Sequence, residues 1–238
     1  MGKPILSVSG LRKHFGGIAA VQDMSFEVQA GEVVGLMGPN GAGKTTLVNL
    51  ITGEHRPDAG KVVFEGRDIT RRSPHKICHL GIARTFQIPQ PFKGLTILQN
   101  VAIAAMYGRG LGKSEALLEA ERLLDFIELA EDKEKLAGDL EEISLKRLEL
   151  GRALATNPTL MLIDEIAAGL TDKEIPPALA LLKRINEMGI TIILIEHIMK
   201  VMMEAVDRII VMDEGEKIAE GEPEEVMENK KVIEAYFG

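Results

Sequence analysis

The stretch from Gly38 to Thr45 limits most strongly what this chain can fold into. It reads GPNGAGKT and fits the spacing G-x-x-x-x-G-K-[ST], directly after an apolar run at Val33–Met37 and directly before a helical pattern. Glycines let such a backbone curl until successive N–H groups point at phosphate oxygens, and the positive end of the following helix adds to the attraction. The pattern therefore predicts a strand, a phosphate-binding loop and a helix in that order, as in an α/β fold.

The side chains of this loop indicate which phosphate ligand it takes. Lys44 is placed to reach the β- and γ-phosphates of a nucleotide, and the hydroxyl of Thr45 is suited to ligate Mg²⁺. We therefore expect MgATP as the ligand. The residues expected to contact it are Gly38, Pro39, Asn40, Gly41, Ala42, Gly43, Lys44, Thr45 and Thr46.

Two carboxylates follow a second apolar run. Leu160–Ile163 is followed by Asp164 and Glu165, and ligands of α/β sheets bind at the carboxyl ends of the strands. Asp164 would hold Mg²⁺, and Glu165 would orient or deprotonate an attacking water. Alone this pair is a weak signal, because strands often end in charged turns. Together with the loop at Gly38 it predicts a hydrolytic site.

Three further side chains are candidates with open alternatives. His197 follows the apolar strand Thr191–Ile195 and is expected at the same sheet edge, where it could bind the γ-phosphate, although a histidine after a strand is usually structural. Gln87 follows Ile82–Phe86 and has the same two alternatives: an amide that takes part in the site, or an ordinary exposed side chain. Phe15 lies beside two glycines and could stack on a base or belong to the core.

Hydrophobic periodicity divides the chain into a core and a helical lobe. The residues before Ile88 form short β-rich runs with one helix after Gly43, and helical patterns follow. The sequence thus predicts one domain over 1–238, with 1–87 and 158–238 as the core and 88–157 as the helical lobe. The early strands are expected at Ile5–Phe15, Met24–Gln29, Glu32–Met37 and Lys61–Phe64, and the lobe helices at Thr96–Met106 and Glu115–Leu129, the latter through Leu117, Leu118, Leu123, Leu124 and Ile127.

The second half of the chain returns to a wound α/β pattern. Strand, helix and strand in succession predict a parallel sheet covered by helices, and a hairpin turning at Glu214-Gly215 precedes two short acidic helices. The expected elements are Leu145–Ala155, Thr159–Ile163, Ala178–Met188, Thr191–Ile195 and the hairpin Arg208–Gly221.

Composition excludes several classes of protein. With 238 residues the chain is long enough for one large domain, and its formal charge of −8 argues against a nucleic-acid partner. Its apolar runs fall far short of the roughly 20 residues needed to cross a bilayer, and Met1–Ser9 lacks the pattern of a secretory signal. The single Cys78 can form no internal disulfide and is expected to be a small buried apolar residue. A cytoplasmic location is the expectation.

Taken together, these residues closely resemble the ATP-binding subunit of ABC transporters, from about Ile5 to Phe237. Within that family the chain looks most like the subunits of branched-chain amino-acid importers. The stretches that carry this resemblance are "FGGIAAV", "GPNGAGKTTLVNLITG", "RTFQ", "LELGRALATNP", "AAGL" and "IEH".

The resemblance implies a P-loop NTPase fold with an antiparallel β subdomain and a helical lobe. It implies that two such subunits sandwich two ATP molecules head to tail beneath two transmembrane permease subunits, at the inner face of the membrane, and serve a substrate-binding protein indirectly. The roles that carry over are Phe15 as the adenine-stacking aromatic, Gly38 to Thr46 as Walker A, Gln87 as the catalytic and metal-binding Q-loop residue, Asp164 and Glu165 as Walker B, and His197 as the switch histidine.

One family element does not carry over. The signature Leu-Ser-Gly-Gly-Gln, or Leu-Ser-Tyr-Gly-Gln in this subgroup, aligns with the segment from Leu140 to Ser144, so that Glu141 replaces the serine and Ile143 the key glycine. A carboxylate facing a triphosphate repels it, and a β-branched residue does not take the positive φ open to glycine. Two smaller departures are Ile166, in place of a proline, and Thr171, in place of the D-loop aspartate.

The departure predicts an asymmetric heterodimer. The intact Walker A, Glu165 and His197 would pair with a good signature on a different partner, whereas the partner's ATP would meet Glu141 and Ile143 and turn over slowly. A shifted register, with Ser144 as the donor to the γ-phosphate, remains the alternative.

The expected function is that of the ATP-hydrolysing subunit of an importer for branched-chain or related hydrophobic amino acids. Two other classes stay open at this point. One is a nucleotide-binding, catalytically weak clamp that regulates its partner. The other is a soluble ATPase of translation or DNA maintenance, which is disfavoured because the chain has neither a second such domain nor a basic insertion.

Overall fold

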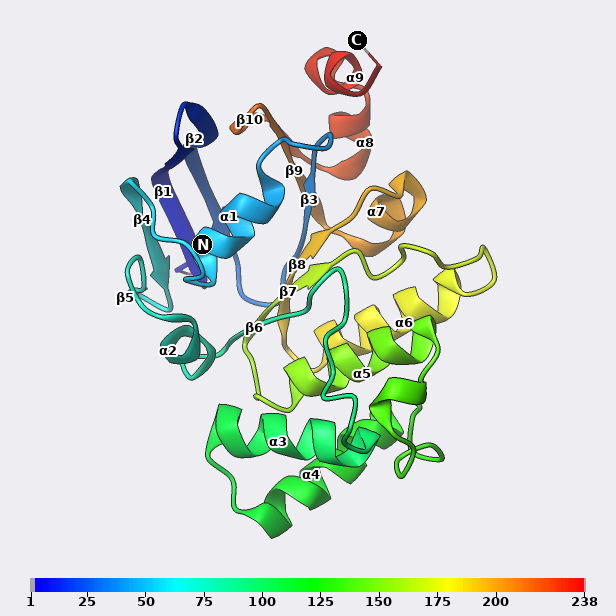
Figure 1. Ribbon diagram of the computed structural model, residues 1–238. Helices are drawn as coiled ribbons and strands as arrows, with labels where there is room; N and C mark the ends of the chain where they lie inside the picture. The colour runs from blue at the N-terminus through cyan, green and yellow to red at the C-terminus, as the bar shows by residue number, and fades with distance from the viewer. Residues whose placement is uncertain (1–2, 238) are drawn as a thin grey trace.

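The computed structural model describes residues 3–237 and contains two sheets with helices around them (Figure 1). The smaller sheet is antiparallel and has the order β2-β1-β4-β5. It shows the separate antiparallel layer that was expected beside an α/β core. Its strands are β1 (Leu6–Phe15), β2 (Ile18–Val28), β4 (Ala59–Phe64) and β5 (Arg67–Asp68).

The larger sheet has the order β10-β9-β3-β8-β7-β6, and its strands from β9 to β6 run parallel. The register aligns Ile195 with both Leu36 and Asp164. The carboxyl ends of three central strands therefore meet at one edge. The strands are β3 (Val33–Met37), β6 (Ile82–Arg84), β7 (Leu160–Asp164), β8 (Thr191–Ile195), β9 (Arg208–Asp213) and β10 (Glu216–Gly221).

Residues 3–237 contain nine α-helices, of which α8 and α9 follow the last strand. Helices α3, α4 and α5 pack against one another on the far side of β6 (Figure 1). The division at residues 88 and 157 stays a prediction. The helices are α1 (Lys44–Ile51), α2 (Pro74–Cys78), α3 (Ile97–Arg109), α4 (Lys113–Phe126), α5 (Glu142–Leu154), α6 (Ile175–Glu187), α7 (Met199–Ala205), α8 (Pro223–Met227) and α9 (Lys230–Phe237), with a 3₁₀ turn at Ala137–Asp139.

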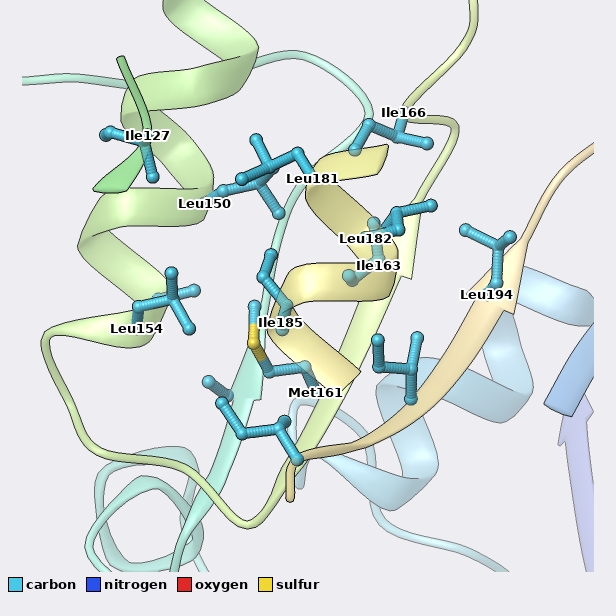
Figure 2. Packing of buried hydrophobic residues seen from close by; sticks show 14 of the residues in the cluster. Ile127, Leu150, Leu154, Met161, Ile163, Ile166, Leu181, Leu182, Ile185 and Leu194 are labelled. Carbon is cyan, nitrogen blue, oxygen red and sulfur yellow. The ribbon is translucent and has the colours of Figure 1, made fainter. Parts of the chain in front are cut away.

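Alternating side chains of the large sheet build two cores, one on each face. Along β7, Met161 and Ile163 join the cluster beneath α5 and α6, whereas Leu160 and Leu162 join the cluster on the opposite face. Figure 2 shows the first cluster, in which β7 and β8 meet the apolar faces of α5 and α6. Period-two alternation over a sheet that is buried on both sides gives this arrangement directly.

Helix α1 lies between the two sheets. Its Leu47, Leu50 and Ile51 are at most 1% exposed and share a cluster with residues of both sheets, among them Leu6 of β1 and Leu162 of β7. The loop in front of α1 is therefore attached to a helix that is packed on two sides.

The chain ends with the predicted hairpin. Glu214 and Gly215 have φ of 46° and 82°, the pair of positive values that a tight two-residue hairpin turn requires. Two short helices follow it, α8 and α9; α8 is acidic as expected, whereas α9 begins with two lysines and contains one glutamate.

Several elements differ from the sequence prediction. β2 begins at Ile18, six residues before the expected Met24, because register shifts in its pairing with β1 and a positive φ of 53° at Asp23 interrupt the alternation. The short helices α2 and α7 were not predicted, since neither is long enough to show a periodic face.

One residue expected on the apolar face of α4 does not lie there. Leu123 and Leu124 are 1% and 0% exposed, but Leu118 is 68% exposed. Adjacent leucines point about 100° apart on a helix, so the stripe that buries Leu117 turns Leu118 outward.

No helix in residues 3–237 has the length and apolar character that crossing a membrane requires.

The two leucines of α4 give a matched test of this packing. Leu124→Ala should lower the free energy of unfolding by about 2–5 kcal/mol, because it removes a fully buried side chain. Leu118→Ala, the same substitution on an exposed position of the same helix, should change it by less than about 0.5 kcal/mol. Urea unfolding followed by circular dichroism measures both, and equal effects would contradict the assignment of the buried face.

Candidate functional site

A cavity of about 580 Å³ opens at the edge where the strands of the large sheet end. Its wall is built from the turns that follow β3, β6, β7 and β8 and from the start of β2. The lining residues are Ile18, Ala19, Ala20, Gln22, Asn40, Gly41, Ala42, Gly43, Lys44, Thr45, Thr46, Gln87, Asp164, Glu165, Ile195, His197 and Glu214. The predicted loop, acid pair, glutamine and histidine thus lie around one space.

The loop from Gly38 to Thr46 fits its place only because of its glycines. A Cβ on Gly38 would lie 2.1 Å from the backbone oxygen of Met212, and one on Gly43 would lie 2.2 Å from that of Ala20. Both glycines also have positive φ, 149° and 99°. The loop is therefore wedged between β9 and β2, and its curl depends on these two positions.

Gly43 is the N-cap of α1, and no side chain caps this end of the helix. The first-turn N–H groups and the positive end of the helix are directed toward the cavity, which is an arrangement suited to an anion. Thr45, in the first turn, is exposed in the cavity wall.

Lys44 is held inside the loop. Its Nζ donates to the backbone oxygens of Gly38 at 2.6 Å and Pro39 at 3.0 Å, and the residue is only 7% exposed. Burial lowers the pKa of the ammonium, and the nearby Glu165 and Asp164 partly oppose this effect. The positive charge of Lys44 is thus partly desolvated inside the loop, and a bound anion would stabilise it.

Asp164 is a mostly buried carboxylate at the end of β7. Burial raises its pKa; Arg84, whose Nη2 lies 3.8 Å from the carboxylate, acts in the opposite direction, and Glu165 adds to the rise. Its backbone N–H donates to Oγ1 of Thr85 at 3.1 Å. The ionised form of Asp164 is therefore incompletely compensated, which is a common property of groups at functional sites.

Arg84, on β6, is a site residue that the sequence did not reveal. Its Nη1 donates to Oδ1 of Asn49 in α1 at 2.5 Å, and its Nε is buried without a hydrogen-bond partner. Burial lowers its pKa, while Asp164 raises it. Arg84 thus ties the strand that carries the acid to the helix that carries the loop.

Glu165 lies in a sharp turn and is bonded at both oxygens. Its φ is 49°, unusual for a residue other than glycine, and its N–H donates to the backbone oxygen of Ile195 at 2.8 Å. Gln87 Nε2 donates to Oε2 at 2.6 Å, and His197 Nε2 lies 2.5 Å from Oε1. The three residues proposed from separate strand ends therefore form one hydrogen-bonded group.

Glu196 holds two of these turns together. It is 1% exposed, and its carboxylate accepts from the N–H groups of Ala167 at 2.6 Å and His197 at 3.1 Å. The turn after β7 and the turn after β8 are thus joined by one buried side chain. A charged residue directly after an apolar strand was the only sequence signal for it.

Lys146, on α5, clamps the turn at Glu165 from the helical side. Its Nζ donates to the backbone oxygens of Glu165 at 3.3 Å and Ile166 at 3.4 Å, and also to that of Ala168. The side chain is 10% exposed. Three carbonyls that converge on one ammonium help to hold the positive φ of Glu165, and nothing in the sequence set Lys146 apart from an ordinary surface lysine.

Phe15 lies away from the cavity lining. Its ring is 43% exposed, packs edge-on against His55 at 5.3 Å, and has Lys13 Nζ 5.2 Å from its centre. The core alternative for this residue is therefore wrong. Cys78 is also elsewhere, half-buried in a separate cavity beside β6, and burial raises the pKa of its thiol.

The segment from Leu140 to Ser144, expected from the resemblance to align with the signature, leads into the start of α5. Glu141 is the N-cap with extended backbone (φ −72°, ψ 162°), and Glu142 is in the first turn, its Oε1 3.9 Å from Lys146 Nζ. Glu141, Ile143 and Ser144 all have negative φ. Two carboxylates thus lie at the positive end of this helix.

Comparison with known proteins agrees with this geometry. Residues 21–168 match the family described as ABC transporter, and residues 216–238 match the family described as branched-chain amino acid ATP-binding cassette transporter. The chain is 38% identical over 245 residues to the probable branched-chain amino acid transport ATP-binding protein LivG of Archaeoglobus fulgidus, covering 98% of this chain and 95% of that protein. It is also 38% identical over 253 residues to the high-affinity branched-chain amino acid transport ATP-binding protein BraF of Pseudomonas aeruginosa, covering 100% and 99%.

A solved structure shows the same fold. The ADP conformation of an ATP-binding cassette of an ABC transporter superimposes with a TM-score of 0.88 at 34% identity and covers 100% of both chains.

The electrostatics of Asp164 predict a change in stability. Its pKa is raised on folding above the ordinary 3.8, so the protonated form, which stabilises the fold, is present below that value and is lost as the pH rises through the folded pKa. Asp164→Asn imitates the protonated form and should therefore raise the Tm of the ligand-free protein at pH 7.5, by an amount that shrinks as the pH falls toward 4. Thermal unfolding across this range measures the effect, and a lower Tm for the variant at pH 7.5 would contradict it.

Proposed function

Because the chain belongs to the family of ATP-binding cassettes that drive ABC transporters, we propose that this cavity binds and hydrolyses MgATP for an importer of branched-chain or related hydrophobic amino acids. The observation that carries the proposal is the meeting of Lys44, Asp164, Glu165, His197 and Gln87 around one cavity at the start of α1. The substrate class is proposed from the names of the relatives, since this subunit supplies energy and does not contact the cargo.

The loop from Gly38 to Thr46 binds the phosphates. Its curled backbone and the uncapped start of α1 present N–H groups, and Lys44 adds a charge that is already within the loop. On binding, the ammonium gains phosphate oxygens in a site of low dielectric, where a charge-assisted hydrogen bond is stronger than in water. Phe15 remains the proposed stacking residue for adenine.

The residues present fit Mg²⁺. Thr45 offers a hydroxyl, Asp164 a carboxylate and Gln87 an amide oxygen, an all-oxygen set of the kind Mg²⁺ takes together with phosphate oxygens and water. When bound, the ion would neutralise charge on the phosphates. The ion would also stabilise the ionised form of Asp164, which burial and Glu165 disfavour.

Glu165 orients or deprotonates the attacking water. His197 and Gln87 position the carboxylate of Glu165. Both oxygens of Glu165 are bonded in this structure. His197 therefore has two tasks in the proposal: it holds Glu165 now and turns to the γ-phosphate when nucleotide is present. The turn itself is fixed by Lys146 from one side and by the N–H of Glu165 bonded to Ile195 from the other.

We further propose that the working unit is a heterodimer beneath two permease subunits, peripheral on the inner face of the cell membrane, with a substrate-binding protein as an indirect partner. The structure of α5 supports the asymmetry, because Glu141 and Glu142 supply negative charge at the helix end that would otherwise face the partner's γ-phosphate. The site formed with a partner's intact signature hydrolyses ATP, and the site that meets Glu141 is slow.

Two variants test the ATP site. Lys44→Ala should weaken MgATP binding about 10- to 100-fold in calorimetry, because it removes charge-assisted hydrogen bonds to phosphate. Glu165→Gln should bind MgATP with near wild-type affinity while hydrolysis, measured with the partner subunits present, falls about 10²- to 10⁴-fold. Lys183→Ala, an exposed lysine on α6, is the matched control. Unchanged turnover in Glu165→Gln would instead support the idle clamp.

The altered signature has its own test. The chain alone should hydrolyse ATP slowly, since both sites of a homodimer would face Glu141 and Ile143. Replacing this pair by Ser and Gly should raise the rate about tenfold or more, because removing about 1.4 kcal/mol of repulsion gives a factor of ten. Glu134→Ser, at an exposed nearby position, should leave it unchanged. Full transporter-like turnover by the wild-type chain alone would sink the idea.

A further inference from the structure

The last helix of the chain reaches the first residue of the phosphate-binding loop. The backbone N–H of Gly38 donates to Oη of Tyr236 at 2.8 Å, across a separation of 198 residues. Tyr236 is on α9, which contacts β10 and α8 and lies near the end of β3 where the loop begins (Figure 1). A residue outside the expected nucleotide-binding motifs thus makes a direct contact with the loop.

Gly38, the residue that Tyr236 contacts, also accepts a hydrogen bond from Lys44. Gly38 accepts from Lys44 Nζ through its carbonyl oxygen at 2.6 Å and donates to Tyr236 through its N–H. Because a Cβ at Gly38 would collide with the backbone of Met212, the space around the residue is already tight. Tyr236 therefore fixes one peptide group beside the ammonium that is proposed to grip the phosphates.

The phenol is held in place by packing as well as by this bond. Tyr236 is half-buried and packs against the main hydrophobic cluster, and Val232, one turn earlier on α9, is 3% exposed. Burial raises the pKa of Tyr236, the bond from Gly38 partly opposes this, and the nearby Asp213 adds to the rise. The hydroxyl is therefore neutral at physiological pH and acts as a fixed acceptor.

We propose that Tyr236 is a positioning residue for the phosphate-binding loop, so that docking of α9 sets the affinity for nucleotide. The proposal rests on the proposed role of the loop at Gly38 to Thr46. It makes the final helix part of the ATP site and not only a cover for the end of β10.

The test compares the same substitution at the two tyrosines of the chain. Tyr236→Phe keeps the ring and removes the acceptor, and it should raise the Kd for MgATP about three- to tenfold in calorimetry, within the range for one lost hydrogen bond. In the assembled transporter KM for ATP should rise with kcat unchanged. Tyr107→Phe, at a position that is 76% exposed, should alter neither value.

A spectroscopic readout separates positioning from a purely structural role. In a Tyr107→Phe protein, Tyr236 is the sole tyrosine, and the chain has no tryptophan, so its fluorescence reports on this one phenol. Magnesium with inorganic triphosphate, a probe without an absorbing base, should change the fluorescence, and Lys44→Ala should abolish the change.

The outcomes are distinct. If Tyr236→Phe lowers Tm but leaves Kd and KM at wild-type values, Tyr236 is structural and the proposal is overturned. A fluorescence signal that does not respond to triphosphate overturns it as well. If Lys44→Ala binds MgATP as tightly as the wild type, the proposed function of the loop fails first.

Discussion

Parallel pairing of β3, β8 and β7, with β6 at their side, is the constraint on which the rest of the structure depends. Each strand is buried on both faces, and its register is fixed by backbone hydrogen bonds. Parallel strands end at the same edge, so the residues after each strand are gathered there regardless of their distance in the sequence. Strand pairing thus brings the loop at Gly38, the acid pair, Gln87 and His197 to one edge. Arg84, Glu196 and Lys146 then fix the turns there.

Three charged side chains of the resulting site have pKa values that are shifted against their charged forms. Burial shifts the pKa of Asp164 upward and those of Lys44 and Arg84 downward, so in each case the charged form is disfavoured. An anion beside Lys44 and a cation beside Asp164 would relieve both effects at once. The proposed ligand, a magnesium-bound triphosphate, carries both charges, whereas free phosphate carries only the negative one.

The sequence allowed most of the longer strands and helices, the loop and the strand-end acids to be predicted because these features are local. A glycine pattern before a lysine or a carboxylate after an apolar run can be recognised without knowing what lies opposite. Arg84, Lys146 and Glu196 were missed because their importance comes from partners on other elements, such as the carbonyls that receive the ammonium of Lys146. Leu118 was placed wrongly because the sequence does not fix where the buried stripe of α4 ends: Leu123 and Leu124 are both buried, whereas Leu118 is exposed.

The hydrogen bonds at Glu165 have a consequence for the geometry of the proposed reaction. Gln87 and His197 each contact one oxygen of this carboxylate. Each oxygen keeps a second lone pair, which in the proposed mechanism can accept from the attacking water while Gln87 and His197 hold the carboxylate in place. The proposed general base is thus aligned before a water arrives, so that little rearrangement of the protein is left for the reaction itself.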